Sequence, residues 1–147
     1  MHSPLSKNFT LAELTVTSTG LPNKPTEAEI ANLQALVTKV LQPLRELYGK
    51  PIKVNSGYRS AVVNRAIGGA TNSQHSTGEA ADLDAADNTS LFLLIRQFLP
   101  FDQLIWEGGT DTQPDWIHVS FRASGNNRKQ VMRMRVVGGK RFMKVIN

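Results

Sequence analysis

The sequence predicts an α+β fold, with helices packed on a mostly antiparallel β-sheet. Two observations carry this prediction. A long amphipathic helical pattern occupies residues 26–48, and short segments of alternating polar and apolar residues recur through the second half of the chain, as expected for strands. A chain of 147 residues can bury a core without disulfide bonds. Since no repeat or long linker divides it, we expect a single domain over residues 1–147.

Capping signals bound the predicted helices. Residues 10–13 (TLAE) have the form of a capping box and predict one helical turn. Residues 26–29 (TEAE) form a second capping box, which opens the long helix. Its leucine and valine stripe is predicted as core, with a bend near Pro43 and an end at Gly49. Two shorter helices are predicted at residues 61–67 and 88–98.

Strand parity brings three candidate metal ligands together. Strands are predicted at residues 51–55, 80–84, 103–106, 116–121 and 130–137, before a Gly138-Gly139 turn and a short tail. Side chains alternate between the two faces of a strand. If the second and fourth of these strands are neighbours, Asp82 and His118 meet on the sheet surface. His75 lies seven residues before Asp82, in a loop that Gly78 allows to turn sharply.

These residues predict a catalytic zinc site on the sheet surface. His75, Asp82 and His118 offer two imidazoles and a carboxylate, and three protein ligands with one open position are typical of catalytic zinc. Asp115 has the opposite parity to His118 and follows Pro114, so we expect its carboxylate to lie over the open position as a general base. Glu107 is the reserve candidate. The third histidine, His2, lies near the N-terminus without a partner motif.

Composition narrows the function classes. There are no cysteines, which excludes thiolate ligands and a cysteine nucleophile. No apolar run approaches the ~20 residues needed to cross a bilayer, so membrane insertion is not expected. The net charge of +5 favours anionic partners, and basic residues concentrate between Arg122 and Lys140. The dense mixture of aromatic and basic residues typical of nucleic-acid surfaces is lacking, and we expect no nucleic-acid partner.

Two motifs carry a family resemblance. Ser-x-His-x-x-Gly-x-Ala-x-Asp at residues 73–82 and Trp-x-His-x-Ser at residues 116–120 resemble the zinc D-Ala-D-Ala carboxypeptidase and L-alanyl-D-glutamate peptidase family. That family is related to lysostaphin and to the hedgehog signalling domain. The resemblance covers residues 56–121, the motif core. It implies one Zn²⁺ per chain, bound by His75, Asp82 and His118, and a base three places before the last histidine. That place holds Asp115, where many relatives carry Glu.

The same resemblance implies three substrate-binding residues. Arg59, in Ser56-Gly57-Tyr58-Arg59-Ser60, matches an arginine that binds substrate near the scissile bond, and a guanidinium fork suits a carboxylate or a polarised carbonyl. Ser73 matches a serine that contacts substrate. Asn64 is expected near a polar substrate-binding position. The predicted catalytic residues are therefore Arg59 and Asp115.

The predicted function is zinc-dependent hydrolysis of peptide bonds in bacterial peptidoglycan stem peptides, in cell-wall lysis or remodelling. A D-Ala-D-Ala carboxypeptidase and an L-Ala-D-Glu endopeptidase both remain open. The alternative is a catalytically silent zinc module that binds cell wall or a protein. The N-terminus lacks the apolar region of a secretory signal. We therefore expect a monomer made in the cytoplasm that reaches the wall through a phage-encoded pore, as bacteriophage endolysins do.

Overall fold

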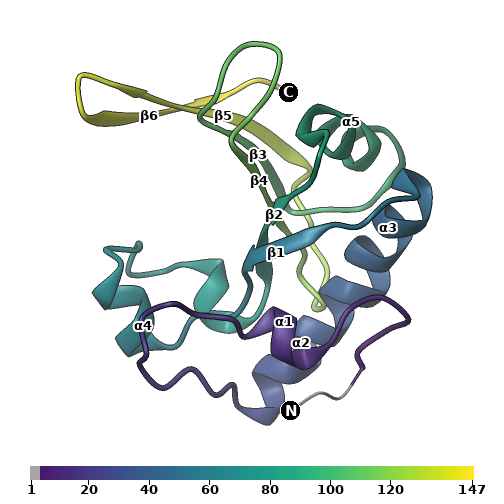
Figure 1. Ribbon diagram of the computed structural model, residues 1–147, viewed down its shortest axis with the longest axis vertical. Helices are drawn as coiled ribbons and strands as arrows, with labels where there is room; N and C mark the ends of the chain where they lie inside the picture. Colours follow the sequence, from purple (N-terminus) through teal and green to yellow (C-terminus); the bar gives the residue numbers. More distant parts are fainter. Residues whose placement is uncertain (1–3) are drawn as a thin grey trace.

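A six-stranded sheet forms the centre of the molecule (Figure 1), seen in a computed structural model that describes residues 4–147 and so leaves His2 outside. The strand order is β1-β2-β4-β3-β5-β6. The strands are β1 (Lys53–Ser56), β2 (Ala80–Asp84), β3 (Gln103–Glu107), β4 (Trp116–Ser120), β5 (Gln130–Val137) and β6 (Lys140–Val145). Only the β3–β5 pair is parallel among these neighbours. The structure therefore confirms the mostly antiparallel α+β fold.

The long helix is continuous but irregular at its middle. It comprises α2 (Glu27–Leu36), the π-helical turn η1 (Val37–Leu41) and α3 (Gln42–Tyr48). The predicted capping box at Thr26 and Glu29 is present, and Gly49 ends the helix in the left-handed conformation. Proline cannot donate to the carbonyl four residues earlier, and π turns relieve such an interruption. The bend expected near Pro43 thus takes the form of a wider turn just before it.

Helices cover one face of the sheet and bury its apolar side chains. In Figure 1 α2, α3 and α5 (Asn88–Phe98) lie along the same side of the strands. The inward residues of β2 and β4 include Leu83 and Ile117, and both are fully buried. They pack with helical residues such as Leu36 and Ile95 in one core cluster. Burial of this face fixes strand register, because a shift by one residue would turn every core side chain outward.

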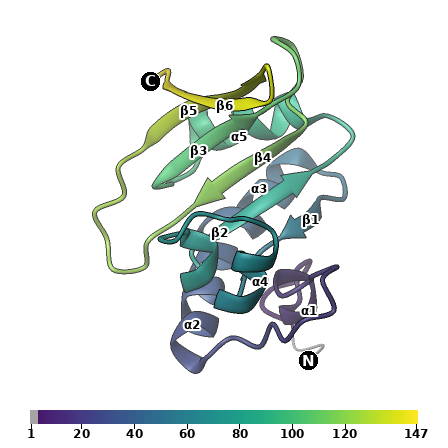
Figure 2. The ribbon, with the colours of Figure 1, turned by 90° about the vertical axis from the view of Figure 1, so that its left-hand side faces the viewer.

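The opposite face of the sheet is open at its centre (Figure 2). Two features flank it. On one side lie α4 (Ala61–Ala66) and the 3₁₀ turn η2 (Gln74–Thr77); on the other, the β5–β6 hairpin extends away from the helical layer. The polar members of β2, β3 and β4 point to this open face by strand parity. The fold therefore exposes the side of the sheet on which the candidate ligands lie.

Two elements differ from the sequence prediction. The tail after Gly138-Gly139 forms a sixth strand, β6, whose large apolar residues are exposed on both faces and so give no one-sided burial pattern. The cap of α5 is Asp87, one residue before the predicted start of this helix. Asn88 is buried and donates to Asp84 Oδ1 at 2.8 Å, so Asp84 helps to fix the start of α5. Within residues 4–147, no helix has the length and apolarity needed to span a membrane.

Candidate metal centre

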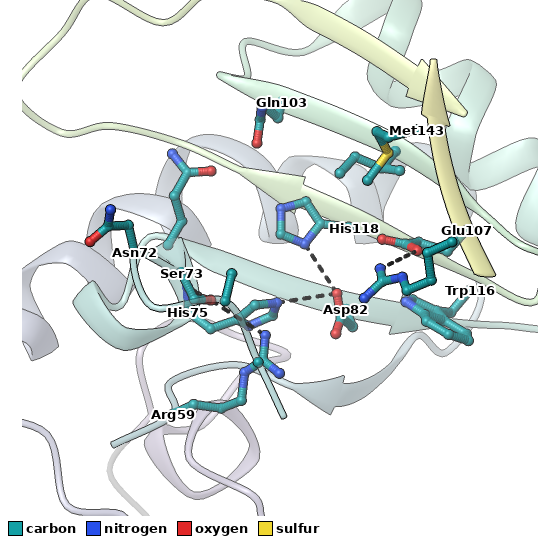
Figure 3. A pocket seen from close by; sticks show the side chains of 15 residues that line it. Arg59, Asn72, Ser73, His75, Asp82, Gln103, Glu107, Trp116, His118 and Met143 are labelled. Atoms are coloured by element: carbon teal, nitrogen blue, oxygen red, sulfur yellow. Dashed lines mark hydrogen bonds and ion pairs between the residues drawn. The ribbon is translucent and has the colours of Figure 1, made fainter. Parts of the chain in front are cut away.

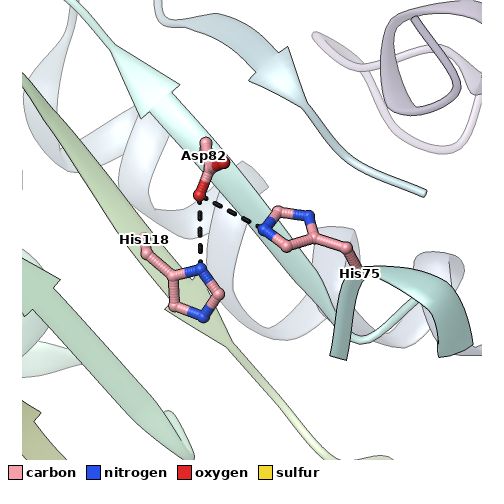
Figure 4. Close-up of side chains that lie close together, drawn as sticks. All are labelled: His75, Asp82 and His118. Atoms are coloured by element: carbon pink, nitrogen blue, oxygen red, sulfur yellow. Dashed lines mark hydrogen bonds and ion pairs between the residues drawn. The ribbon is translucent and has the colours of Figure 1, made fainter. Parts of the chain in front are cut away.

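Three side chains from two strands and one turn converge on the open face (Figure 4). Asp82 of β2 and His118 of β4 are direct cross-strand partners. His118 Nδ1 lies 3.2 Å from Asp82 Oδ1, and His75 Nε2 lies 3.3 Å from the same oxygen. One donor atom from each residue falls within 4.8 Å of the others. The structure thus brings together the three residues that the sequence predicted as metal ligands.

His75 is held by the backbone around it. The turn η2 is capped by Ser73, whose hydroxyl accepts from the His75 amide at 3.2 Å. It ends at Gly78, which has a φ of +77°. The His75 side chain is buried, and its Nδ1 lies 2.8 Å from the Gly57 carbonyl oxygen. Since a carbonyl only accepts, Nδ1 carries the proton and Nε2 presents its lone pair to the site.

This arrangement fits a bound cation. Two acceptors, His75 Nε2 and Asp82 Oδ1, face each other at 3.3 Å, which is repulsive unless a proton or a metal ion lies between them. Burial lowers the pKa of His75 and so disfavours the extra proton. Burial also raises the pKa of Asp82, but the interaction with His118 at 3.2 Å opposes this effect, and that pKa is held well below its usual range. Neutral imidazoles and an ionised carboxylate are the donor set that zinc accepts.

A cavity of about 320 Å³ surrounds the three donors (Figure 3). Its floor is the open face of β2, β4 and β3. One wall comes from Arg59 and the segment before η2, and the other from β6. Trp116 closes one end, while Trp106 on the other face of the sheet packs against Phe92 in the core. The donors therefore lie at the bottom of a pocket that is open to solvent on one side.

Glu107 also lines this pocket. It is paired with Trp116 in the sheet and lies two residues along β3 from Ile105, the partner of His118. Its side chain is 7% exposed, and its Oε2 has no hydrogen-bond partner within residues 4–147. Burial raises the pKa of Glu107, and the Asp82 carboxylate adds to this effect, which the nearby His118 and Arg141 oppose. A buried carboxylate with a raised pKa, beside a cation site, has the properties of a general base.

A family model described as Peptidase M15 matches residues 7–120, which include all these pocket residues of β2, β3 and β4. The chain belongs to the peptidase M15 family. Its relatives include the zinc D-Ala-D-Ala carboxypeptidase of Streptomyces albus G, which is 46% identical over 80 residues. That match covers 53% of this chain and 31% of the relative, so the chain spans about a third of that protein. The resemblance seen in the two sequence motifs is therefore confirmed at the level of the family.

Asp115 does not reach the pocket of this M15 domain. It precedes β4, is exposed, and its Oδ2 accepts from the Gly109 amide at 3.0 Å. There it lines a separate depression with Arg133 and Arg135. The two glycines of the β3–β4 loop have positive φ values, 61° at Gly108 and 68° at Gly109, and this turn draws the Asp115 carboxylate back onto the loop. The expected position of Asp115 over the histidines is thus corrected, and Glu107 occupies the pocket instead.

Arg59 and Ser73 lie in the pocket as predicted, and Asn64 does not. The Arg59 amide donates to the His75 carbonyl at 3.0 Å, and its guanidinium lies 3.5 Å from the Ser73 hydroxyl. Burial lowers the pKa of Arg59, which Asp82 counteracts, and its Nε has no partner within residues 4–147. Asn64 is buried in α4 and donates to the Ala70 carbonyl at 2.8 Å. This bond gives Asn64 a structural contact outside the pocket lining.

Several pocket residues were missed from the sequence. Gln103 and Ile105 share the face of His118 by parity, and the predicted strand at 103–106 contained this signal. Arg141 and Met143 line the pocket from β6. No sequence signal identified them, because β6 itself was not expected.

Proposed function

We propose that this protein is a zinc-dependent peptidase that hydrolyses peptide bonds in bacterial peptidoglycan stem peptides. The observation that carries the proposal is the convergence of His75, Asp82 and His118 beside the buried carboxylate of Glu107. Membership of the M15 family supports hydrolysis of a peptide bond. The relative from Streptomyces albus G supports zinc as the metal and D-Ala-D-Ala as a substrate.

Each residue has a task in this proposal. His75 Nε2, His118 Nδ1 and an Asp82 carboxylate oxygen would hold the ion. Zinc, when bound, would polarise a carbonyl and lower the pKa of a water molecule to roughly 7. Glu107 accepts the proton of the attacking water at its carboxylate and returns it to the leaving amine, for which its raised pKa is suited.

Arg59 and Ser73, on the pocket wall opposite β6, would orient the substrate. The Arg59 backbone is fixed by the bond from its amide to the His75 carbonyl, and its side chain lines the pocket, where the guanidinium can bind a substrate carbonyl or carboxylate. Ser73 caps η2 and lies against the same guanidinium. Ser73 therefore orients both Arg59 and His75.

Digestion of purified peptidoglycan tests the proposal. The zinc-loaded protein is incubated with wall material, and released fragments are identified by mass spectrometry. We expect loss of terminal D-Ala or cleavage between L-Ala and D-Glu, abolition by a chelator and recovery with zinc. Tight zinc binding without any cleavage would instead identify a silent zinc-binding module and would overturn the proposed activity.

Two matched variants assign the base. Glu107→Gln and Asp115→Asn each remove one carboxylate without changing size, and neither residue is among the three metal donors. We expect Glu107→Gln to retain zinc and to lose 10²-fold to 10⁴-fold in kcat, the usual contribution of a general base. Asp115→Asn should lose far less, since its carboxylate contacts the Gly109 amide. The opposite order would return the base to Asp115.

The proposed setting is wall lysis or remodelling by a monomeric single-domain enzyme, with bacteriophage lysis and pore release as one such setting. An added role of the basic C-terminal region in wall attraction is limited by its own ion pairs. Arg128 binds Asp102, and Arg133 and Arg135 bind Asp111. Exposed lysines of this region, Lys129, Lys140 and Lys144, carry charge that remains available for an anionic wall.

A further inference from the structure

The β5–β6 hairpin adds a second wall to the pocket, and it lies outside the part of the chain that the family model matches. Alternation along β6 sends Arg141 and Met143 to the pocket side. Phe142 and Lys144 point the other way and line a different depression. The hairpin therefore contributes a cation and an apolar side chain to the pocket that the M15 core alone does not supply.

The Arg141 guanidinium is poorly engaged by the protein. Its ion-pair partner is Glu107 Oε2 at 3.7 Å, which is longer than a hydrogen bond. The Arg141 side chain is 66% exposed, and it donates no side-chain hydrogen bond within residues 4–147. By contrast, Arg128 makes three hydrogen bonds to Asp102 if its amide is counted. Arg141 thus keeps its donors available at the mouth of the pocket.

The charges of the pocket favour an anionic ligand. Arg59 and Arg141 both line the pocket, together with the carboxylates of Asp82 and Glu107. A divalent ion on the three donors would leave this set net positive. A guanidinium at such a position binds a carboxylate through two parallel hydrogen bonds, which gives both affinity and orientation.

We propose that Arg141 binds a carboxylate of the substrate and makes the enzyme selective for acidic peptides. This inference rests on the proposed peptidase function and specifies its substrate class. The carboxylate has two sources in a stem peptide, the C-terminus of D-Ala-D-Ala and the α-carboxylate of D-Glu. Both present the same chemistry to the guanidinium.

Matched synthetic peptides test the inference. The probes are a stem pentapeptide ending in D-Ala-D-Ala, the same peptide with a C-terminal amide, and the same peptide with the D-Glu α-carboxylate amidated. Wild type, Arg141→Ala, Arg141→Lys and Lys140→Ala are compared, after equal zinc content and thermal stability have been verified. Lys140 is the control, because it is also a cation of β6 but points to the other face of the hairpin.

We expect wild type to prefer the peptide with the recognised carboxylate over its amide by roughly 10-fold to 100-fold in kcat/KM, the usual effect of a charged hydrogen bond. Arg141→Ala should abolish this preference by lowering kcat/KM for the acidic peptide only. Arg141→Lys should retain part of it, and Lys140→Ala all of it. In wild type, the amidation that lowers kcat/KM identifies which of the two carboxylates is bound.

Equal losses on acidic and amidated peptides would overturn the inference, since they would mean that Arg141 acts only on Glu107. An absence of preference in wild type would overturn it too. If wild type cleaves none of the peptides, the proposed function fails separately. Calorimetric dissociation constants of the same peptides then decide the role of Arg141, with the same acid-to-amide ratio expected and its absence refuting the inference.

Discussion

Asp102 is predicted to be the main electrostatic anchor of the pocket wall. It is fully buried at the start of β3, and its carboxylate accepts four hydrogen bonds. Three come from the backbone and side chain of Arg128 at 2.8–3.0 Å, and one comes from Gln74 Nε2 at 2.9 Å. Gln74 directly precedes His75, so this carboxylate ties the C-terminal segment to the turn that carries a proposed metal ligand.

Asp102→Asn should destabilise the fold by about 3 kcal/mol. The amide keeps the size of the side chain but places a donor where an oxygen accepted, which leaves Gln74 or Arg128 facing another donor. Breaking a buried pair in this way costs roughly 3–5 kcal/mol, and we take the lower end because the Arg128 side chain is 46% exposed and can return to water. Urea unfolding of the metal-free protein, followed by tryptophan fluorescence, measures the change.

Asp111→Asn is the matched control. Asp111 also pairs with two arginines, Arg133 at 2.9 Å and Arg135 at 3.2 Å, but its side chain is 80% exposed. Exposed pairs contribute about 0–1 kcal/mol, so this variant should lose less than about 1 kcal/mol. Similar losses in the two variants, or a loss below about 1 kcal/mol for Asp102→Asn, would refute the assignment of Asp102 as a buried anchor.

Three further predictions concern pH, metal and backbone. Burial raises the pKa of Asp102, but the Arg128 hydrogen bonds hold it well below its usual range. The contribution of Asp102 to folding stability is therefore full above the unfolded pKa of about 3.9 and is lost as the pH falls toward the folded pKa. Asp102→Asn should thus flatten the acid limb of a plot of stability against pH. Zinc at about 100 times its Kd should raise the Tm by roughly 8 °C in calorimetry, and Asp82→Asn should remove most of this shift. Gly78→Ala should weaken zinc binding and cost more than about 2 kcal/mol in urea unfolding, because a methyl there would lie 2.5 Å from the Glu29 carbonyl oxygen. Gly20→Ala is the control: its φ is +74° and no atom lies within 4 Å of the added methyl, so it should cost only about 1–2 kcal/mol. Equal costs in the two variants would contradict the clash at Gly78.

The convergence of the candidate ligands could be predicted because strand parity is a local property. Asp82 and His118 each occupy a short segment with one clearly apolar face, and burial of Leu83 and Ile117 fixes both registers. The polar members then have to lie on the open face. His75 could be added because the glycine at 78 has the conformation that a sharp turn requires.

The position of the Asp115 carboxylate and the second wall of the pocket could not be predicted, for different physical reasons. The position of the Asp115 carboxylate depends on how the loop of residues 108–115 turns, and the glycines at the start of this loop allow many backbone conformations. Glu107 is the last residue of β3 and lies on the same face of the sheet as Ile105. Strand parity therefore predicted this face, but nothing in the sequence showed that the Glu107 side chain would be buried. Arg141 lies on an edge strand without a core face, where alternation carries little information.

The most direct test of a zinc centre formed by His75, Asp82 and His118 is the metal content of the purified protein. After stripping with a chelator, wild type is titrated with zinc in competition with a chromophoric chelator, and the bound metal is counted by elemental analysis. One zinc ion per chain is expected for wild type, and near zero for a variant in which Asp82 and His118 are both replaced by alanine. Unchanged stoichiometry in that variant would place the metal elsewhere and contradict the account.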